Sequence, residues 1–246
     1  MGGVVGRIHA PLRLETVNDE LLAKLPDFTK RLEWFLRHRP DLCKSAASVT
    51  KTGAGNRRLF SVVNSDRLRK ILSRMLDENE FLSPYGLRSL SKYHESHPLL
   101  QTIGGKPYSI AYEPAESTTI LFGGNSNWRG PIWFPLNYLI IEALQKFDYY
   151  HGEEFKVECP TRSGTFLTLW EVSVELSRRL ISIFKQTGSS CRPVSAGISQ
   201  FQTDSHFRDL ILFHEYFNGD NGAGLGASHQ TGWTALVAKL IEQSGE

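Results

Sequence analysis

The chain has 246 residues, of which 40% are hydrophobic and 22% are charged, as is ordinary for a soluble globular protein with one sizeable core. The formal net charge is +2 and no basic run stands out, so the composition gives no sign of a nucleic-acid partner. No apolar run approaches the roughly 18–20 residues that a membrane helix needs, and we expect no membrane association.

Cysteine and histidine usage argues against disulfide and metal chemistry. The three cysteines are far apart and odd in number, and they lack the paired spacing of a zinc site. We therefore expect reduced thiols in a cytoplasmic protein. The eight histidines are scattered, and residues 218–222 lack the remaining ligand positions of an EF-hand. We expect no metal and no cofactor, and the oligomeric state stays open.

Apolar residues three and four positions apart predict five helices. These cover about residues 22–36, 65–76, 133–147, 169–184 and 233–241. Pro40 is expected to stop the first helix, and Asn64 or Ser65 to cap the second. Thr168 and Glu171 form a capping-box pattern at the start of the fourth helix.

Strand signals are sparse. Residues 108–112 alternate, and residues 210–217 can be extended. A weaker short helix is expected over residues 87–93. Residues 82–130 show little helix otherwise, and loops of that length inside a compact domain are usually functional. The pattern predicts an all-α chain with long structured loops.

The carboxylate of Glu215 is the first candidate for chemistry. It lies within the aromatic run FHEYF at residues 213–217, and four glycines follow in residues 219–226. A polar cleft on one side and an aromatic wall on the other can tune a carboxylate for acid or base work. A surface Glu at a strand end is the plainer alternative. The glycines favour function, because they allow the backbone to approach a ligand or another segment closely.

A second cluster, residues 123–137, combines amides, a guanidinium and two indoles at a helix entrance. Sugars stack on aromatic rings and accept paired polar contacts from side chains such as Asn127 and Arg129. Trp133 belongs to an apolar stripe and is expected in the core. For Trp128 and Arg129, a ligand role and a structural role are about equally favoured.

Two further loops supply polar candidates. Gln230 precedes Trp233 at the entrance of the last helix, where Gln230 can hold a hydroxyl group or a water molecule. For His229 the alternative is a place in the N-terminal cap region of that helix with no catalytic part. Tyr85 and Arg88 lie on a small polar loop that would mean little alone.

Three of these segments together resemble glycoside hydrolase family 63, in its bacterial-type branch related to processing α-glucosidase and to mannosylglycerate and glucosylglycerate hydrolases. The segments are FLSPYGLRSLS at residues 81–91, GNSNWRGPIW at 124–133, and EYF with GLGASHQTGW at 215–217 and 224–233. The likeness runs from about Leu14 to Ile241. Three long motifs in the same order make it specific.

The resemblance implies an (α/α)6 barrel and inversion at the anomeric carbon, with two carboxyl groups about 6.5–9.5 Å apart. By its place in the Glu-Tyr-Phe motif, Glu215 matches the general base. Sugar-contact candidates are Tyr85, Asn127, Trp128, Arg129, Gln230 and Trp233. The family's general acid is an Asp in a Trp-Asp context more than two hundred residues before the base, and no residue here has that context.

The number of predicted helices fits an incomplete barrel. Twelve helices of about 12 residues need roughly twice the five or six segments found. We therefore expect residues 1–246 to form the C-terminal half of a glycoside hydrolase catalytic domain, with an oligosaccharide or small glycoside as substrate. The alternative is a non-catalytic fragment or a carbohydrate-binding remnant.

Overall fold

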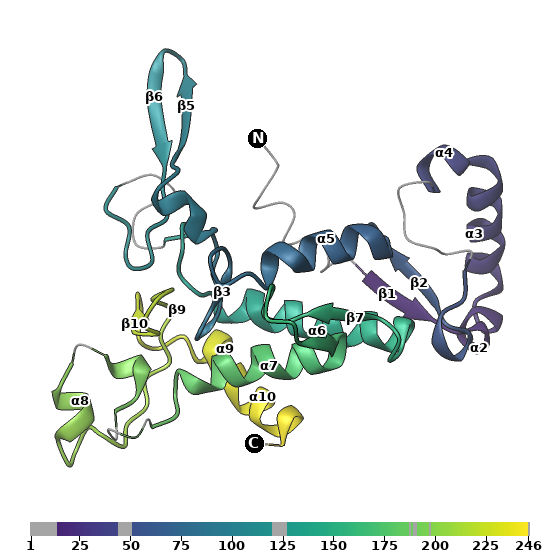
Figure 1. Cartoon of the computed structure of the whole chain (residues 1–246). Helices are drawn as coiled ribbons and strands as arrows, with labels where there is room; N and C mark the ends of the chain where they lie inside the picture. Colours follow the sequence, from purple (N-terminus) through teal and green to yellow (C-terminus); the bar gives the residue numbers. More distant parts are fainter. Residues whose placement is uncertain are drawn as a thin grey trace. The chain divides into compact units, whose positions relative to one another are not determined.

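The computed structural model describes residues 14–43, 51–119, 127–186, 188, 191–196 and 198–245 (Figure 1). The chain divides into two compact units. Unit 1 takes residues 1–74 and 140–173, and unit 2 takes residues 75–139 and 174–246. The helices α6 (Phe134–His151) and α7 (Leu169–Ser182) each contribute to both units.

Unit 1 begins with short helices where one longer helix was expected. The elements are α2 (Asp19–Ala23), α3 (Pro26–His38) and α4 (Pro40–Cys43). The prediction of one helix over residues 22–36 was wrong at its start, because Pro26 has no N–H for a continuing helix and instead occupies the first turn of α3. The helix ends before Pro40, as expected.

The remaining elements of unit 1 are two two-stranded antiparallel sheets and most of α5 (Ser65–Met75). Strand β1 (Leu14–Val17) pairs with β2 (Arg58–Ser61), and β7 (Lys156–Glu158) pairs with β8 (Phe166–Thr168). A 3-10 turn, η2 (Ala54–Asn56), precedes β2.

Two predicted helix starts are confirmed by their capping hydrogen bonds. The side chain of Asn64 accepts from the backbone N–H of Arg67 at 2.9 Å at the start of α5. At the start of α7, the N–H of Glu171 donates to Thr168 Oγ1 at 3.2 Å. The N–H of Thr168 donates back to Glu171 Oε2 at 2.7 Å. These reciprocal bonds are the capping box that the sequence predicted.

Unit 2 is built from short hairpins, 3-10 turns and helix ends. Its strands pair as β3 (Leu82–Ser83) with β4 (Gly86–Leu87), β5 (Leu99–Ile103) with β6 (Lys106–Ile110), and β9 (Tyr216–Phe217) with β10 (Gly224–Leu225). Its other elements are η3 (Lys92–Glu95), η4 (Pro193–Ser195), α8 (Gln200–Thr203), α9 (Thr231–Thr234) and α10 (Leu236–Ser244).

The all-α prediction is too narrow. The structure is mixed, with helices and five two-stranded antiparallel sheets, and its described residues show no closed barrel. The prediction of a short helix over residues 87–93 was wrong, since β4 ends at Leu87 and the 3-10 helix η3 begins only at Lys92. Most of these strands have only two to four residues, too few for an alternating pattern to stand out in the sequence.

One buried amide joins helix α6 to the β3–β4 hairpin within unit 2. The side chain of Asn137 is 3% exposed. Its Oδ1 accepts from the N–H of Leu87 at 2.7 Å, and its Nδ2 donates to the carbonyl of Leu87 at 3.1 Å and to that of Trp133 at 3.0 Å. The amide of Asn137 therefore makes the two hydrogen bonds with the backbone of Leu87 that a neighbouring strand would otherwise make.

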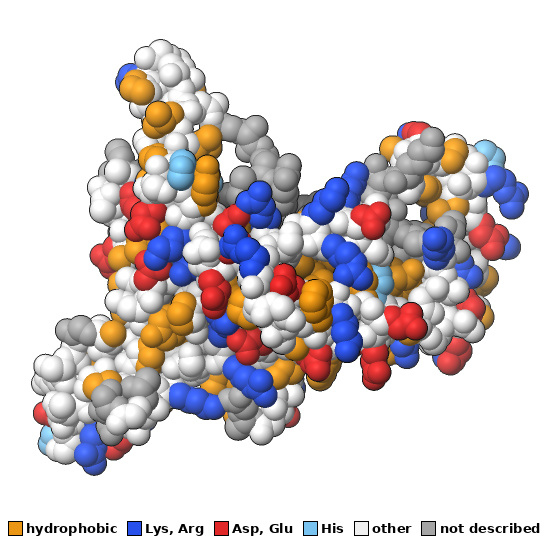
Figure 2. All heavy atoms as spheres, viewed as in Figure 1, with side chains coloured by type: hydrophobic (Ala, Val, Ile, Leu, Met, Phe, Trp, Pro, Cys, Tyr) orange, Lys and Arg blue, Asp and Glu red, His pale blue; other side chains and the backbone are white. Residues whose placement is uncertain are grey.

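The β5–β6 hairpin of unit 2 is largely exposed. Hydrophobic side chains lie open along it in the space-filling view (Figure 2). These are Leu99, Leu100, Ile103 and Tyr108. Separately, no described helix is both long enough and apolar enough to cross a lipid bilayer.

Candidate active site

Backbone pairing in unit 2 brings the three sequence motifs together. Ile132 forms antiparallel bridges with Arg88 on one side and with Phe217 on the other. Ile132 and Phe217 exchange both backbone hydrogen bonds, at 2.8 and 3.0 Å. Segments that lie more than forty residues apart in the sequence therefore form one narrow ribbon.

Two glycines make this close approach possible. A Cβ at Gly219 would lie 2.6 Å from the carbonyl oxygen of Gly130 and 2.7 Å from Tyr112 Oη. A Cβ at Gly130 would lie 2.6 Å from the carbonyl oxygen of Glu113. The glycine-rich motifs thus serve backbone-to-backbone packing here, one of the two uses that the sequence suggested.

Four aromatic rings form a layered platform in unit 2. The indole of Trp133 stacks on Trp128 with centroids 3.9 Å apart and on Tyr216 with centroids 4.9 Å apart. Trp233 lies tilted beside Trp133 at 5.7 Å. Trp133 and Tyr216 are buried, whereas Trp128 is 41% exposed and Trp233 is 39% exposed. The platform thus offers two indoles for contact with a ligand, and Trp133 lies in the core as expected.

Glu215 lies beside this platform. It directly precedes Tyr216, it is half-buried, and its Oε2 accepts from the N–H of Ala227 at 3.4 Å. A Cβ on Gly226 would lie 2.8 Å both from Glu215 Oε2 and from the ring of Tyr216. The carboxylate and the aromatic platform therefore meet at Gly226.

The pKa of Tyr216 reflects its burial and the nearby charge of Glu215. Burial raises the pKa of Tyr216 to about 12, and the negative charges of Glu116 and Glu215 add to the effect. The phenol next to Glu215 therefore stays protonated across the physiological pH range.

Gln230 and Trp233 are tied to the same segment by backbone contacts. The N–H of Gln230 donates to the carbonyl of Phe213 at 2.8 Å, and Thr234 Oγ1 donates to the carbonyl of His214 at 2.6 Å. The entrance of α9 is thereby held against the residues that precede Glu215. His229, in contrast, is exposed.

Asn127 and Arg129 lie in the interior of their loop. Asn127 is 1% exposed, and its Nδ2 donates to the carbonyls of Glu113 and Ala115. Arg129 is 3% exposed and its Nη2 donates to Glu113 Oε2 and to Ser117 Oγ, both at 2.5 Å. The described contacts of both side chains fix the loop that carries Trp128.

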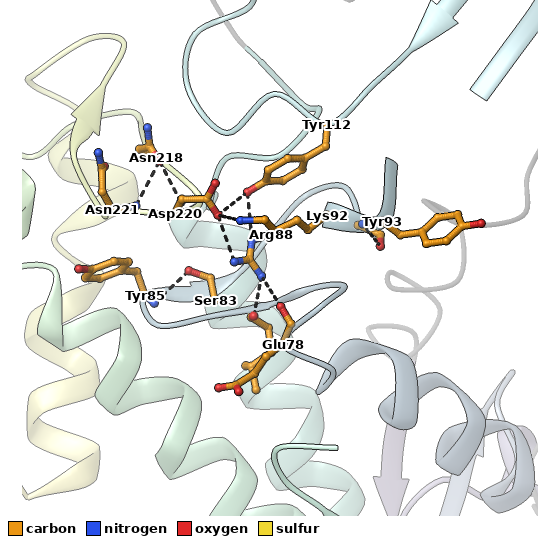
Figure 3. Close-up of polar contacts among 12 residues, drawn as sticks. Glu78, Ser83, Tyr85, Arg88, Lys92, Tyr93, Tyr112, Asn218, Asp220 and Asn221 are labelled. Carbon is orange, nitrogen blue, oxygen red and sulfur yellow. Dashed lines mark hydrogen bonds and ion pairs between the residues drawn. The ribbon is translucent and has the colours of Figure 1, made fainter. Parts of the chain in front are cut away.

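A network around Asp220 was missed by sequence reasoning (Figure 3). Asp220 Oδ1 accepts from Tyr112 Oη at 3.0 Å, and from Arg88 Nη2 and Lys92 Nζ at 3.2 Å each. Arg88 is 5% exposed and also donates to the carbonyl of Leu82 at 2.5 Å. The sequence shows the two opposite charges of this network, Asp220 in the 218–222 loop and Arg88 in the 81–91 motif, but not that they meet.

The positive charges of Arg88 and Lys92 keep Asp220 ionised. Burial raises the pKa of Asp220, but hydrogen bonds from Lys92 and Tyr112 and the charges of Arg88 and Lys92 outweigh it, so the pKa lies below its usual value. Asp220 is therefore a carboxylate at neutral pH. It holds the 218–222 turn against residues 88–92.

Tyr85 lies at the turn of the β9–β10 hairpin. A Cβ on Gly222 would lie 2.8 Å from its ring, so the backbone of Gly222 packs flat on the phenol. Tyr85 also lines a cavity of about 520 Å³ together with Asn221 and residues of the 191–202 segment. The structure thus places Trp128 and Trp233 against Trp133, which stacks on Tyr216, the residue after Glu215. Tyr85 lies at the other end of the β9–β10 hairpin.

The chain is similar to known proteins over a range that includes the three sequence motifs. Residues 58–234 match the model of the mannosylglycerate hydrolase MGH1-like glycoside hydrolase domain. A Saccharomyces cerevisiae protein that is itself uncharacterized is 52% identical over 233 residues, which make up 94% of this chain and 21% of that protein. The mannosyl-oligosaccharide glucosidase of the same yeast is 26% identical over 72% of this chain and 15% of its own length.

A third relative has a similar identity to this chain. The probable mannosyl-oligosaccharide glucosidase of Schizosaccharomyces pombe is 25% identical over 74% of this chain and 16% of its own length. The chain therefore spans about a fifth or less of the length of these curated relatives.

Proposed function

Because the chain belongs to the mannosylglycerate hydrolase MGH1-like family of glycoside hydrolase domains, of the family 63 type, we propose that it supplies the general base of an inverting α-glycosidase. Glu215 is the base that activates water. The substrate is an oligosaccharide or a small glycoside of glucose or mannose. The observation that carries the proposal is the half-buried Glu215 carboxylate beside the ring of Tyr216, which stacks on Trp133 in the aromatic platform.

The geometry suits this role in two ways. A sugar ring stacked on Trp128 or Trp233 presents its C–H face to the indole and leaves its polar edge free for hydrogen bonds. The N–H of Ala227 donates to Glu215 Oε2 at 3.4 Å, which orients the carboxylate while leaving Oε1 for a water molecule. Asn127 and Arg129 contribute by holding the Trp128 loop, and Gln230 contributes a polar contact at the α9 entrance.

Inversion needs a second carboxyl group, about 6.5–9.5 Å from the first, to protonate the leaving oxygen. This chain has no Trp-Asp sequence. We propose that residues 1–246 form the C-terminal half of an (α/α)6 barrel whose acid lies outside them. The chain covers 21% and 15% of two relatives, which supports the part of the proposal that places the acid outside it. Cytoplasmic localisation is our proposal from the odd number and wide spacing of the three cysteines in the sequence.

The test measures free glucose and free mannose released from α-glucosides and α-mannosides by the product of the full reading frame. Replacing Glu215 with Gln keeps the shape and removes the base, and we expect at least a 10²-fold loss of rate. Glu116→Gln is the matched control, because it removes an exposed loop carboxylate that also acts on Tyr216. Hydrolysis that survives Glu215→Gln unchanged would exclude Glu215 as the base.

The absent acid also favours a second candidate function, in which the isolated 246-residue chain binds carbohydrate without cleaving it. Losing one member of an acid–base pair costs about 10²–10⁴ in rate. Cleavage by the isolated chain at the rate of the full-length product would contradict this second candidate and leave the first in place.

A further inference from the structure

The cavity beside Tyr85 belongs to unit 2 and lies outside the residues assigned to catalysis. Its volume of about 520 Å³ is within the range of small-ligand sites. Apart from Tyr85 and Asn221, its lining comes from residues 191–193, 195, 196, 198, 199 and 202. None of Glu215, Trp128 and Trp233 lines it.

The lining contains one permanent charge, the guanidinium of Arg192. Its Nη1 donates to the carbonyl of Phe184 at 3.1 Å. Its Nε is buried and, within the part of the chain that the structure describes, has no hydrogen-bond partner. No Asp or Glu occurs between residues 186 and 203 of the sequence.

This is an unusual state for an arginine. A partly buried guanidinium that lines a cavity and has no carboxylate partner favours an anion in that cavity, because its planar donors suit charged oxygen atoms. Among the described residues, no carboxylate forms an ion pair with Arg192. A bound anion is the simplest source of the missing charge.

The rest of the lining narrows the class of anion. Tyr85 offers an aromatic ring, and Ser195, Ser199 and Asn221 offer hydroxyl and amide groups. An aromatic ring suits the C–H face of a pyranose, and the hydroxyls and amide suit its hydroxyl groups. A planar guanidinium suits a carboxylate.

We propose that this cavity binds an acidic monosaccharide unit, a pyranose that carries a carboxylate, with Arg192 as the anion contact and Tyr85 as the stacking surface. The proposal goes beyond the hydrolysis proposed above, because binding here requires neither Glu215 nor a general acid.

Isothermal titration calorimetry of the whole chain tests it, with glucuronate as the probe and glucose as its neutral counterpart. We expect saturable binding of glucuronate and at least tenfold weaker binding of glucose. Arg192→Gln should weaken glucuronate binding tenfold or more, as expected for loss of a charge-assisted hydrogen bond. Arg208→Gln is the matched control, because Arg208 is an exposed arginine of the same unit.

Two further variants keep the result interpretable. Circular dichroism checks the fold of each variant. If Arg192→Gln does not fold, Arg192→Lys takes its place, and it should bind glucuronate more weakly than the unmodified chain because Lys lacks the planar donor pair of Arg. Glu215→Gln should bind glucuronate like the unmodified chain, so failure here is distinguishable from failure of the proposed catalysis.

Several outcomes would overturn the proposal. One is the absence of glucuronate binding at millimolar concentration, and another is equal affinity for glucose. Unchanged affinity in a folded Arg192 variant would do the same. If inorganic phosphate competes equally and Tyr85→Leu has no effect, the cavity is a general anion site and not a sugar site.

Discussion

The indole of Trp128 lies parallel to that of Trp133, with ring centroids 3.9 Å apart and planes within 2°. The outer face of Trp128 is open, since the residue is 41% exposed, while Trp133 is 2% exposed. One indole thus supports the other, and Trp133 in turn stacks on Tyr216, the residue that follows Glu215.

Replacing Trp128 with Ala should weaken binding of glucose- or mannose-containing oligosaccharides by about three- to tenfold. An aromatic stacking contact is worth about 0.5–1.5 kcal/mol, which sets this range. Titration calorimetry measures it. Trp170→Ala is the control, because Trp170 is similarly exposed but lies at the start of α7 in unit 1. An equal loss in both variants would remove the specific role of Trp128.

Asp220→Asn should lower the free energy of unfolding at pH 7 by about 1–3 kcal/mol, because it removes the charge that Arg88 and Lys92 share. The pKa of Asp220 is depressed in the folded state, so its stabilisation is present above its unfolded pKa of about 3.9. That stabilisation is lost as the pH falls through the lower folded value.

Urea unfolding at pH 7 and pH 3 measures the effect of Asp220→Asn. The difference between the variant and the unmodified chain should shrink at the lower pH. Asp209→Asn serves as control, because its pair with Arg208 is exposed and worth little. A difference that stays constant with pH would mean that the charge of Asp220 is not what stabilises the turn.

His151 should make the chain sensitive to mild acid. Burial lowers its pKa to about 4, and the charge of Arg69 lowers it further. Below about pH 6.5 the unfolded chain binds a proton at this position that the folded chain does not, so stability falls as the pH drops toward 4. The slope from this one group is at most about 1.4 kcal/mol per pH unit.

His151→Phe should flatten the stability profile between pH 6.5 and 4, since Phe keeps the packing against Phe155 and Tyr150 and cannot bind a proton. Thermal unfolding across this range measures it. The exposed His206 gives the control variant His206→Phe, which should leave the profile unchanged. A steep profile that persists in His151→Phe would show that another group causes it.

Gly219→Ala should destabilise unit 2 by about 1–3 kcal/mol, because the added Cβ meets Gly130 and Tyr112 at 2.6 and 2.7 Å. Gly232→Ala is the opposite case. Nothing lies within 4 Å of a Cβ there and the residue is in α9, so we expect a gain of about 0.5–1 kcal/mol. Chemical denaturation of both variants measures the difference, and equal effects would mean that the close backbone approach is unimportant.

Much of the helical structure could be predicted from the sequence, because the apolar spacing and the caps act locally. The caps at Asn64 and Thr168 form as expected, and α6 ends at His151, before Gly152. The β3–β4 and β9–β10 hairpins could not be predicted, because each strand has two residues and is set by partners distant in the sequence.

The candidate site, like the fold, could be predicted from the sequence only in part. The aromatic and carboxylate content around Glu215 was visible in the sequence, whereas the interior positions of Asn127 and Arg129 were not. Their polar groups are used by Glu113, Ala115 and Ser117, and only the folded loop brings these together. The identity of a polar side chain does not reveal whether its partner is a ligand or the protein's own backbone.

The bonds of Asn137 have a consequence for the rigidity of the aromatic platform. Sliding or turning the first turn of α6 relative to Leu87 would break two hydrogen bonds in a buried setting at once. The same amide also binds the carbonyl of Trp133. The central indole is therefore anchored through its own backbone, so a bound sugar would meet a preorganised surface and would not have to order a loose one.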